Sequence, residues 1–325
     1  MDRRRNLAAG VVIATLALVP LVASWLGQPF YVTLVSRIMI FALAAVGLNL
    51  VLGYGAMVSF GHALYIGIGA YAVGILSFHG VTNGWAHLAA ALGVGLATAV
   101  LIGLVCLRTT GVAFIMITLA FAQMFFFLAV SVRQYGGDEG MPLAARSDFG
   151  LLDLGNGVAL YYAIFAVLAA TLFAFHRLVH SKFGMVLRGC KMNPRRMSAI
   201  GFPTLRYRLT AYVISALVCV VAGVLMANLT RFVSPSYMQW SVSGELMVMV
   251  VLGGMATLIG PVVGAAVWLI LEELLSSVRL GLPGAGAELV SSHWLGLMGL
   301  FALIVALALK QGLYGLLVGR EGKTS

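Results

Sequence analysis

Long apolar stretches alternate with short polar segments along almost the whole chain. A helix needs about 20 predominantly apolar residues to cross the roughly 30 Å hydrocarbon core of a bilayer. The stretches that approach this length are 7–26, 32–52, 56–78, 86–106, 112–132, 159–178, 210–230, 242–260, 261–278 and 294–311. The pattern predicts an all-α fold, a polytopic membrane bundle of about 8–10 transmembrane or broken helices. We expect it to form one domain over residues 1–325.

The composition agrees with lipid as the solvent. Of the 325 residues, 62% are hydrophobic and 9% are charged, and the mean hydropathy is +1.04. Soluble domains average about 25% charged residues. The net charge of +10 would suggest nucleic acid as the partner of a soluble protein. Here we expect membrane lipid and no nucleic acid, because Lys and Arg gather on the cytoplasmic side of membrane proteins.

The first apolar stretch has two interpretations. It follows "MDRRR" and precedes "VAS", as in a cleaved signal peptide. The apolar run is longer than the usual signal-peptide core of about 7–15 residues. We therefore favour a retained first helix, with a signal peptide as the alternative.

The basic residues predict an orientation. With the N-terminus inside and the stretches alternating, 15 of the 20 Lys and Arg residues fall in inside segments and 4 in outside segments, while Arg37 lies within a span. The inside residues are Arg3, Arg4, Arg5, Arg108, Arg177, Lys182, Arg188, Lys191, Arg195, Arg196, Arg206, Arg208, Lys310, Arg320 and Lys323. The outside residues are Arg133, Arg146, Arg231 and Arg279. Both termini are predicted to be cytoplasmic, because basic residues mark that side.

The inside loop 179–209 carries the sequence "RGCKMNPRRMSAIGF" from Arg188 to Phe202. Pro194 is suited to the first turn of a short helix and Gly201 to its end. Met197 and Ile200 lie three residues apart and can share an apolar face. The loop is either a basic anchor for lipid headgroups or a helix that docks into a groove of a cytoplasmic partner.

Two Gly-rich breaks interrupt the apolar stretches and resemble each other. Val51-Leu52-Gly53 matches Val251-Leu252-Gly253, and a hydroxyl residue, a Gly and a Gly-Ala pair follow each in the same order, with spacings that differ. Glycines also serve close helix packing, but broken helices expose backbone that must face protein or a water-filled cavity. We expect an internal repeat and the following pathway or hinge residues: Gly53, Gly55, Ser59, Gly61, His62, Gly253, Gly254, Thr257, Gly260 and Pro261. For His62, a hydrogen-bonded packing role is the favoured alternative.

The outside loop 133–158 is long and holds acidic residues, among them Asp138 and Glu139. It is either a solvated connection or a contact site for an external protein. Arg37, Glu245 and the pair Glu272-Glu273 lie near predicted outer ends, where long side chains can reach the interface.

Other classes of function lack a motif. We expect no catalytic and no metal-binding residues, because no HExxH, paired carboxylates or Ser/His/Asp arrangement stands out. Gly322-Lys323-Thr324 is not a phosphate-binding loop, since Leu317 stands where the first Gly is required. A self-sufficient secondary carrier and a membrane-embedded enzyme remain as weaker alternatives.

Several stretches together resemble one family. They are "GLNLVLGYGAMVSFGHALYIGIGAYAVGIL", "GVAFIMITLAFAQMFFFL", "RQYGGDEGMP", "FGMVLRGCKMNPRRMSAIGF", "YRLTAYVISALVCVVAGVLMANLTRFVSP" and "GELMVMVVLGGMATLIGPVVGAAV". The chain resembles the membrane permease subunits of branched-chain amino acid ABC importers, specifically the longer of the two paired permeases.

The resemblance implies a multi-pass protein of the bacterial cytoplasmic (inner) membrane that forms half of a translocation pathway. The implied partners are a second permease, which we expect to make a heterodimer, two cytoplasmic ATPases and a periplasmic or extracellular solute-binding protein. No cofactor is expected in this chain, since ATP and magnesium belong to the ATPases. Similar permeases also serve urea and short amides, so these solutes stay open as alternatives.

The resemblance also implies roles for two loops. The family's ATPase-coupling segment falls on Asn193, Pro194, Arg195, Arg196, Met197, Ile200 and Gly201. Many relatives have Glu on either side of the Asn, where this chain has Met192 and Pro194, so its charge pattern at that contact differs. The outer match implies a binding-protein contact at Gly137, Asp138 and Glu139.

Overall fold

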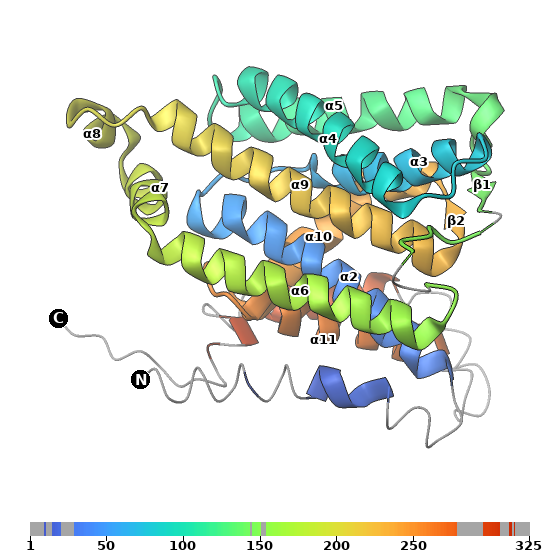
Figure 1. The fold of residues 1–325 in the computed structure, drawn as a ribbon. Coiled ribbons are helices and arrows are strands. Elements are labelled where there is room, and N and C mark those ends of the chain that lie inside the picture. Colours follow the sequence, from blue (N-terminus) through green and yellow to red (C-terminus); the bar gives the residue numbers. More distant parts are fainter. Residues whose placement is uncertain are drawn as a thin grey trace.

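The computed structural model describes residues 10, 15–20, 29–143, 145–150, 154–277, 295–305, 312–313 and 315, and its long helices run side by side (Figure 1). The described α-helices between residues 29 and 277 are α2 (Pro29–Asn49), α3 (His62–Phe78), α4 (Gly84–Cys106), α5 (Val112–Ser131), α6 (Gly157–His180), α7 (Lys182–Met192), α8 (Pro194–Ala199), α9 (Thr204–Thr230), α10 (Trp240–Gly253) and α11 (Gly260–Ser277). A further apolar helix covers Leu295–Val305.

Short elements connect these helices. A π-helix, η1 (Leu50–Tyr54), continues α2, and two 3₁₀ turns are η2 (Arg133–Tyr135) and η3 (Pro235–Met238). The strands β1 (Met141–Pro142) and β2 (Phe232–Val233) pair antiparallel, with Met141 opposite Val233.

Most predicted spans are confirmed closely. The stretch 86–106 is α4, 112–132 is α5 and 159–178 lies within α6. Among the described residues, five helices are long and apolar enough to cross a membrane, with α2 and η1 taken as one: Phe30–Tyr54, α4, α5, α6 and α9. Most of the first stretch, 7–26, and the "VAS" site lie outside the described residues, so the choice between a retained helix and a signal peptide is not decided.

Polar side chains set several helix boundaries. The Asn83 side chain accepts hydrogen bonds from Trp85 N (2.9 Å) and Ala86 N (3.4 Å) and so caps α4. Asn156 caps α6 in the same way through Val158 N, at 3.0 Å. A side-chain oxygen at this position satisfies backbone N–H groups that have no partner within the helix.

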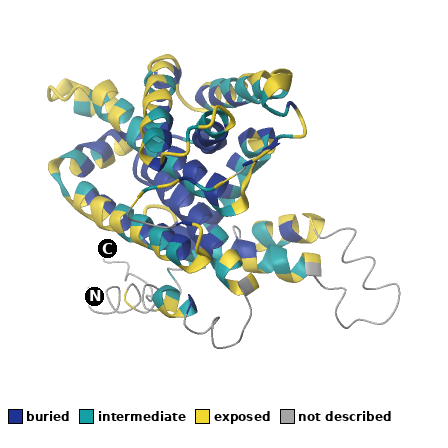
Figure 2. Ribbon diagram, turned by 45° about the vertical axis from the view of Figure 1, so that its right-hand side comes forward, coloured by how far each residue is buried: buried dark blue, intermediate teal, exposed yellow. Residues whose placement is uncertain are grey.

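The bundle has a buried centre and an outer surface of exposed apolar side chains. Helix α9 packs against α2, α3 and α4, and α2 also packs against α6, α10 and α11. In the span Phe30–Tyr54, 83% of the residues in its apolar 18-residue stretch are buried, whereas the corresponding share in α5 is 17%. Figure 2 shows the buried residues in the middle of the bundle and exposed ones on the outer helices. An exposed, continuously apolar helix such as α5 suits a hydrocarbon environment.

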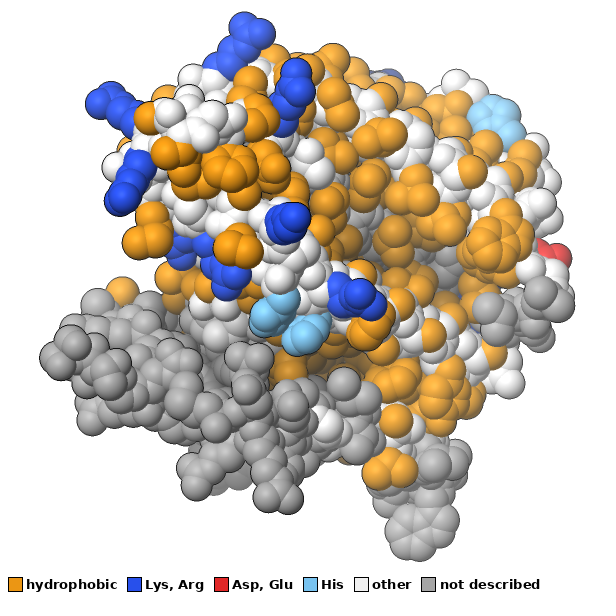
Figure 3. All heavy atoms as spheres, turned by 60° about the vertical axis from the view of Figure 1, so that its left-hand side comes forward, with side chains coloured by type: hydrophobic (Ala, Val, Ile, Leu, Met, Phe, Trp, Pro, Cys, Tyr) orange, Lys and Arg blue, Asp and Glu red, His pale blue; other side chains and the backbone are white. Residues whose placement is uncertain are grey.

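The two ends of the bundle differ in charge. One end carries α7, α8 and the start of α9, where Figure 3 shows Lys and Arg side chains gathered over apolar ones. The exposed basic residues there include Lys182, Arg188, Arg195, Arg196 and Arg206. We call this the basic end. The opposite end carries β1, β2 and the exposed acids Asp138 and Glu139.

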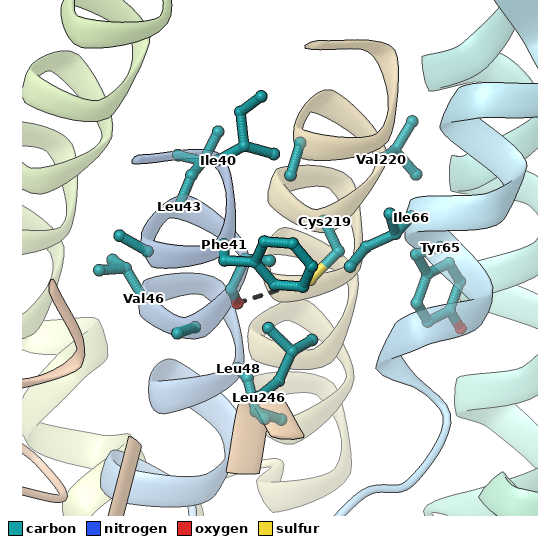
Figure 4. Close-up of a cluster of buried hydrophobic side chains, with 14 of the residues drawn as sticks. Ile40, Phe41, Leu43, Val46, Leu48, Tyr65, Ile66, Cys219, Val220 and Leu246 are labelled. Carbon is teal, nitrogen blue, oxygen red and sulfur yellow. Dashed lines mark hydrogen bonds between the residues drawn. The ribbon is translucent and has the colours of Figure 1, made fainter. Parts of the chain in front are cut away.

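Close helix contacts at the centre depend on small residues. Figure 4 shows the side chains of α2, α3, α9 and α10 converging, with the Cys219 thiol against the Ala44 carbonyl (3.7 Å). A Cβ atom added at Gly69 in α3 would clash with Val220 O, and one at Gly223 in α9 would clash with Ile66 O. These glycines let α3 and α9 approach backbone to backbone, as is common in membrane bundles.

Candidate functional site

The first break, residues 53–61, separates two helices that meet at the centre of the fold. Helix α2 ends in the π-helix η1, and α3 starts at His62. Between them Ala56 has a φ of 51°, a left-handed conformation that costs an alanine about 1 kcal/mol or more. The Ser59 hydroxyl accepts from Gly61 N at 3.2 Å, which satisfies a donor at the start of α3. We call this segment break 1.

The second break, residues 253–260, has the same plan. Helix α10 ends at Gly253, Gly254 has a φ of 114°, and Ala256 has a φ of 60°. The Thr257 hydroxyl accepts from Gly260 N at 3.1 Å and donates to Gly254 O at 2.7 Å. Pro261 then lies in the first turn of α11, where a missing N–H is tolerated. We call this segment break 2.

The plan shared by the two breaks agrees with the predicted internal repeat. Ala56 and Ala256 each follow the Val-Leu-Gly triplet by the same offset and are both left-handed. The Ser59 and Thr257 hydroxyls each accept from a backbone N–H where the next helix begins. They follow the alanine at different offsets, so the spacings of the two breaks diverge after the alanine.

The two breaks touch each other through Asn49. Its side-chain amide donates to Thr257 O at 2.7 Å, and its oxygen accepts from Ala256 N at 3.0 Å. A Cβ atom on Gly53 would clash with Asn49 Oδ1 and Ala256 N. Asn49, which is 2% exposed, thus joins segments about two hundred residues apart. Sequence reasoning missed this role, although a lone amide in an apolar run was a usable signal.

Break 1 also borders a cavity of about 60 Å³ lined by Ala56, Met57, Thr110, Phe114 and Arg208, among others. Arg208 Nε lies 3.4 Å from the Met57 sulfur. Irregular backbone at membrane depth occurs where it is buried in protein or lines a cavity, and break 1 meets both conditions.

His62 is fully buried and hydrogen-bonded at both ring nitrogens. Nδ1 lies 3.0 Å from Ser59 Oγ, and Nε2 lies 2.9 Å from Ser215 Oγ in α9. Beside it the hydroxyls of Tyr65 and Tyr212 are 3.1 Å apart. The ring ties the start of α3 to α9, which agrees with the packing alternative stated for this histidine.

The inside loop 179–209, which carries the predicted coupling segment, holds two short helices. Helix α7 ends at Met192, and α8 begins at Pro194 with the Asn193 side chain accepting from Arg196 N at 3.0 Å. Gly201 has a φ of 91°, the left-handed geometry typical of a helix C-terminus. The predicted short helix with a Pro start and a Gly stop is confirmed.

The apolar side chains of this segment differ in exposure. Ile200 is 63% exposed and Met192 is 88% exposed. Met197 is only half-exposed, because its side chain lies over Gly189 of α7, where an added Cβ would be 2.7 Å from the sulfur. Part of the Met197 surface predicted to be free is therefore used to pack α8 on α7.

Lys191, counted in the sequence only as a positive charge, reaches break 1. Its ammonium donates to the carbonyl oxygen of Gly53 at 2.7 Å. The inside loop 179–209, which carries the predicted coupling segment, is therefore in direct contact with the predicted hinge.

The outside loop is held in place rather than being a loose connection. Gly136, Gly137 and Gly140 all have positive φ, of 90°, 53° and 80°. Leu143 N donates to Arg231 O at 2.9 Å, next to the β1–β2 pair. Asp138 and Glu139 are exposed at the turn, while Gly137 is buried beneath them.

Residues that sequence reasoning did not single out fix the rest of this loop. Arg146 Nη1 donates to Leu154 O at 2.7 Å, and its Nε donates to Asn228 O at 3.0 Å. Burial, and then the charge of Arg231, lower the pKa of Arg146 below its usual range. Ser147 N donates to Asn228 Oδ1 at 2.7 Å.

Arg37 has a partner that sequence reasoning did not identify. Arg37 of α2 forms an ion pair with Glu272 of α11 at 3.5 Å and lies over the Phe41 ring. Both residues were expected near outer ends of their spans, and intramembrane charges commonly pair with one another.

A family model for the permease component of branched-chain amino acid transport systems matches residues 30–316. The chain belongs to this family. It is a multi-pass membrane permease, a transport component and not an enzyme, and both breaks and the coupling segment lie within the matched region.

Curated relatives agree with the family match. The permease is 24% identical over 289 residues to the high-affinity branched-chain amino acid transport system permease protein LivM of Salmonella typhimurium, covering 80% of this chain and 67% of the relative. It is 26% identical over 288 residues to LivM of Escherichia coli, with the same coverage. It is 26% identical over 257 residues to the corresponding LivH of Escherichia coli, covering 73% of this chain and 82% of the relative. No solved structure matches the permease.

Proposed function

We propose that this permease is one of two membrane-spanning subunits of an ABC importer for branched-chain or related amino acids. The second subunit is a similar permease, two cytoplasmic ATPases hydrolyse ATP with magnesium, and a solute-binding protein delivers the solute. The family match over residues 30–316 carries the proposal. The relatives' names, which include both LivM and LivH, support a pair of different permeases.

In this proposal the basic end faces the cytoplasm of a bacterial cell, and both termini lie on that side. The support is the excess of Lys and Arg on α7, α8 and their flanks. Single cysteines at Ser325 and Asp138 test it by labelling from one face of sealed vesicles. Labelling of both positions from the same face contradicts this orientation.

The two breaks line or hinge the pathway for the solute. Both are irregular and joined by Asn49, and break 1 borders a cavity. Backbone groups in such segments can bond to a polar solute or change conformation without disrupting a continuous helix.

Helix α8 docks into a cleft of an ATPase, with Ile200 and Met197 as apolar anchors and Arg195 and Arg196 at the rim. Buried apolar anchors commonly contribute about 2 kcal/mol or more, whereas rim charges mostly aid encounter. We expect Ile200→Asp to abolish co-purification of the ATPase and Arg195→Ala to weaken it mildly in a salt-dependent way. The reverse pattern would favour a lipid anchor.

The exposed pair Asp138 and Glu139 contacts the binding protein on the other face. The turn that carries it is fixed by glycines of positive φ and by the β1–β2 pair, so the two carboxylates are presented on a rigid base. Replacing both by their amides is expected to reduce stimulation of ATP hydrolysis by the binding protein, and unchanged stimulation contradicts the contact.

Uptake in proteoliposomes tests the whole proposal. The permease is reconstituted with a second permease and ATPase subunits of the same organism. The vesicles are given the binding protein and ATP with labelled leucine, isoleucine, valine, other amino acids and urea. We expect uptake of a branched-chain amino acid that needs both ATP and the binding protein. Uptake of urea or a short amide alone would reassign the solute, and uptake driven by an ion gradient without ATP would indicate a secondary carrier.

A further inference from the structure

We propose that Lys191 is a positioning residue that links the coupling segment to both breaks and thereby sets their conformation during transport. The inference rests on the proposed function for its role in coupling. In this inference, one hydrogen bond transmits movement from α8 to the pathway. It is the bond between the Lys191 ammonium and the carbonyl oxygen of Gly53.

The bond joins two helix ends that complement each other. Gly53 lies at the end of the α2–η1 helix, where carbonyl oxygens lack partners within the helix. A cation at a helix C-terminus bonds to such carbonyls and interacts favourably with the helix dipole. At 2.7 Å the contact is as short as a charge-assisted hydrogen bond.

On one side, Lys191 moves with α8. It lies in the last turn of α7, two residues before the Asn193 cap of α8. The Met197 side chain seated over Gly189 packs α8 against α7. A partner that displaces α8 therefore displaces the lysine as well.

On the other side, Gly53 is in contact with break 2. Its Cα has no space for a Cβ, because Asn49 Oδ1 and Ala256 N lie against it. Asn49 bonds to both Ala256 N and Thr257 O, and the Thr257 hydroxyl caps α11 at Gly260. A contiguous chain of hydrogen bonds and backbone contacts thus runs from α7 through break 1 and break 2 to α11.

The hydrogen bond has two discrete states, made and broken, which is what a coupling element requires. A lysine serves this purpose because its flexible stem and compact ammonium can leave one carbonyl and return. Break 2 can respond, because Met255 is 52% exposed at its tip and two residues around it have positive φ.

The test compares Lys191→Met, which keeps the stem and removes the charge, with Lys191→Arg, which keeps the charge. Lys182→Met is the matched control, since Lys182 lies on the same helix and is exposed. In the reconstituted complex, amino acid uptake per ATP hydrolysed is expected to fall about tenfold in Lys191→Met, the effect of losing one charge-assisted hydrogen bond. It should recover partly in Lys191→Arg and stay unchanged in Lys182→Met.

A second measurement needs no partner protein. The rate of thiol labelling at Met255→Cys is measured in the purified permease with each Lys191 and Lys182 variant. The native cysteines Cys106, Cys190 and Cys219 are buried. Background labelling of native thiols should therefore be low. We expect faster labelling of break 2 in Lys191→Met, by about tenfold, and wild-type labelling in Lys182→Met.

The two measurements separate failure of this inference from failure of the proposed function. If the wild-type complex takes up no amino acid, the proposed function is wrong, while the labelling rates still decide whether Lys191 sets the conformation of break 2. If uptake is coupled and Lys191→Met behaves like Lys182→Met in both measurements, the inference is overturned. Equal loss in Lys191→Met and Lys191→Arg, with lowered thermal stability in both, also overturns it, because this is the result expected of a purely structural lysine.

Discussion

Break 1 and break 2 have the same local plan but different surroundings. In each, a helix ends at or just after a Val-Leu-Gly triplet, the chain turns at a left-handed alanine, and a hydroxyl accepts from a backbone N–H where the next helix begins. Break 1 is enclosed: Met57 within it is 2% exposed, and Lys191 bonds to its Gly53 carbonyl. Break 2 is open at Met255, which is 52% exposed.

The difference indicates that two similar segments can have different roles: the enclosed break can control a conformational change, and the open break can undergo it. Break 1 is held by α7, His62 and Asn49, so its conformation depends on segments around it. Break 2 is held to break 1 by the two hydrogen bonds of Asn49 and internally by Thr257. Segments with fewer buried contacts open more readily, so break 2 is the one that we expect to move.

The largest effect is expected at Gly253, where break 2 is most tightly closed. A Cβ atom there would clash with the Gly260 carbonyl oxygen, which is backbone and cannot rotate away. Gly253→Ala should lower the free energy of unfolding by about 3 kcal/mol, measured by denaturant titration in detergent. Gly244→Ala in the same helix is the control, because its Cβ would meet only Phe60 at 3.7 Å. A tolerated Gly253→Ala would show that the break opens freely.

The position of each break could be predicted from the sequence, but their contact could not. Hydropathy and helix-breaking glycines are local signals, and they located the ends of α4, α5 and α6 to within a few residues. The pairing of Asn49 with Ala256 and Thr257 is a tertiary contact between distant segments, and no local signal specifies a partner. The same limit explains Met197, whose burial depends on Gly189 of a neighbouring helix.

Loss of the Asn49 bridge is expected to have the next largest effect. Asn49→Leu leaves the backbone N–H of Ala256 and the carbonyl of Thr257 without their side-chain partner, which should cost about 2 kcal/mol of unfolding free energy. It should also make break 2 independent of break 1, so that labelling at Met255→Cys no longer responds to Lys191→Met. Ser36→Ala sets the background, because it removes a hydrogen bond within α2 alone. A persistent response would mean that the coupling runs by another route.

The charged residues show a second limit of sequence reasoning. Lys191 belongs to the basic end and satisfies the positive-inside pattern like its neighbours, yet its ammonium bonds to the Gly53 carbonyl of break 1. Arg37 pairs with Glu272 of α11, a partner that its position in the sequence does not indicate. Charge counting assigns a side of the membrane, whereas the role of each charge depends on which helix lies opposite.

Accessibility gives a smaller and more direct comparison of the two breaks. Single cysteines at Met57 and Met255 should differ in thiol labelling by at least about tenfold, with Met255→Cys the faster, because an enclosed site reacts only when the structure opens. The measurement is the labelling rate in the purified permease without partners. Similar rates at both positions would remove the distinction between an enclosed and an open break.

The smallest effect is expected from the two left-handed alanines. Ala56→Gly and Ala256→Gly each remove the steric cost of a positive φ, of about 1–2 kcal/mol, but they add flexibility to the unfolded chain that offsets about half of it. Each variant should therefore raise the free energy of unfolding by about 0.5 kcal/mol. If the breaks are structural repeats, the two gains in the free energy of unfolding should be equal within error.

The same two variants should differ in thiol labelling. Because break 2 is the more open, the flexibility added by Ala256→Gly should speed labelling at Met255→Cys, whereas Ala56→Gly should leave labelling at Met57→Cys slow. Equal changes in labelling at both sites would show that the repeat is symmetric in its motion as well as in its geometry.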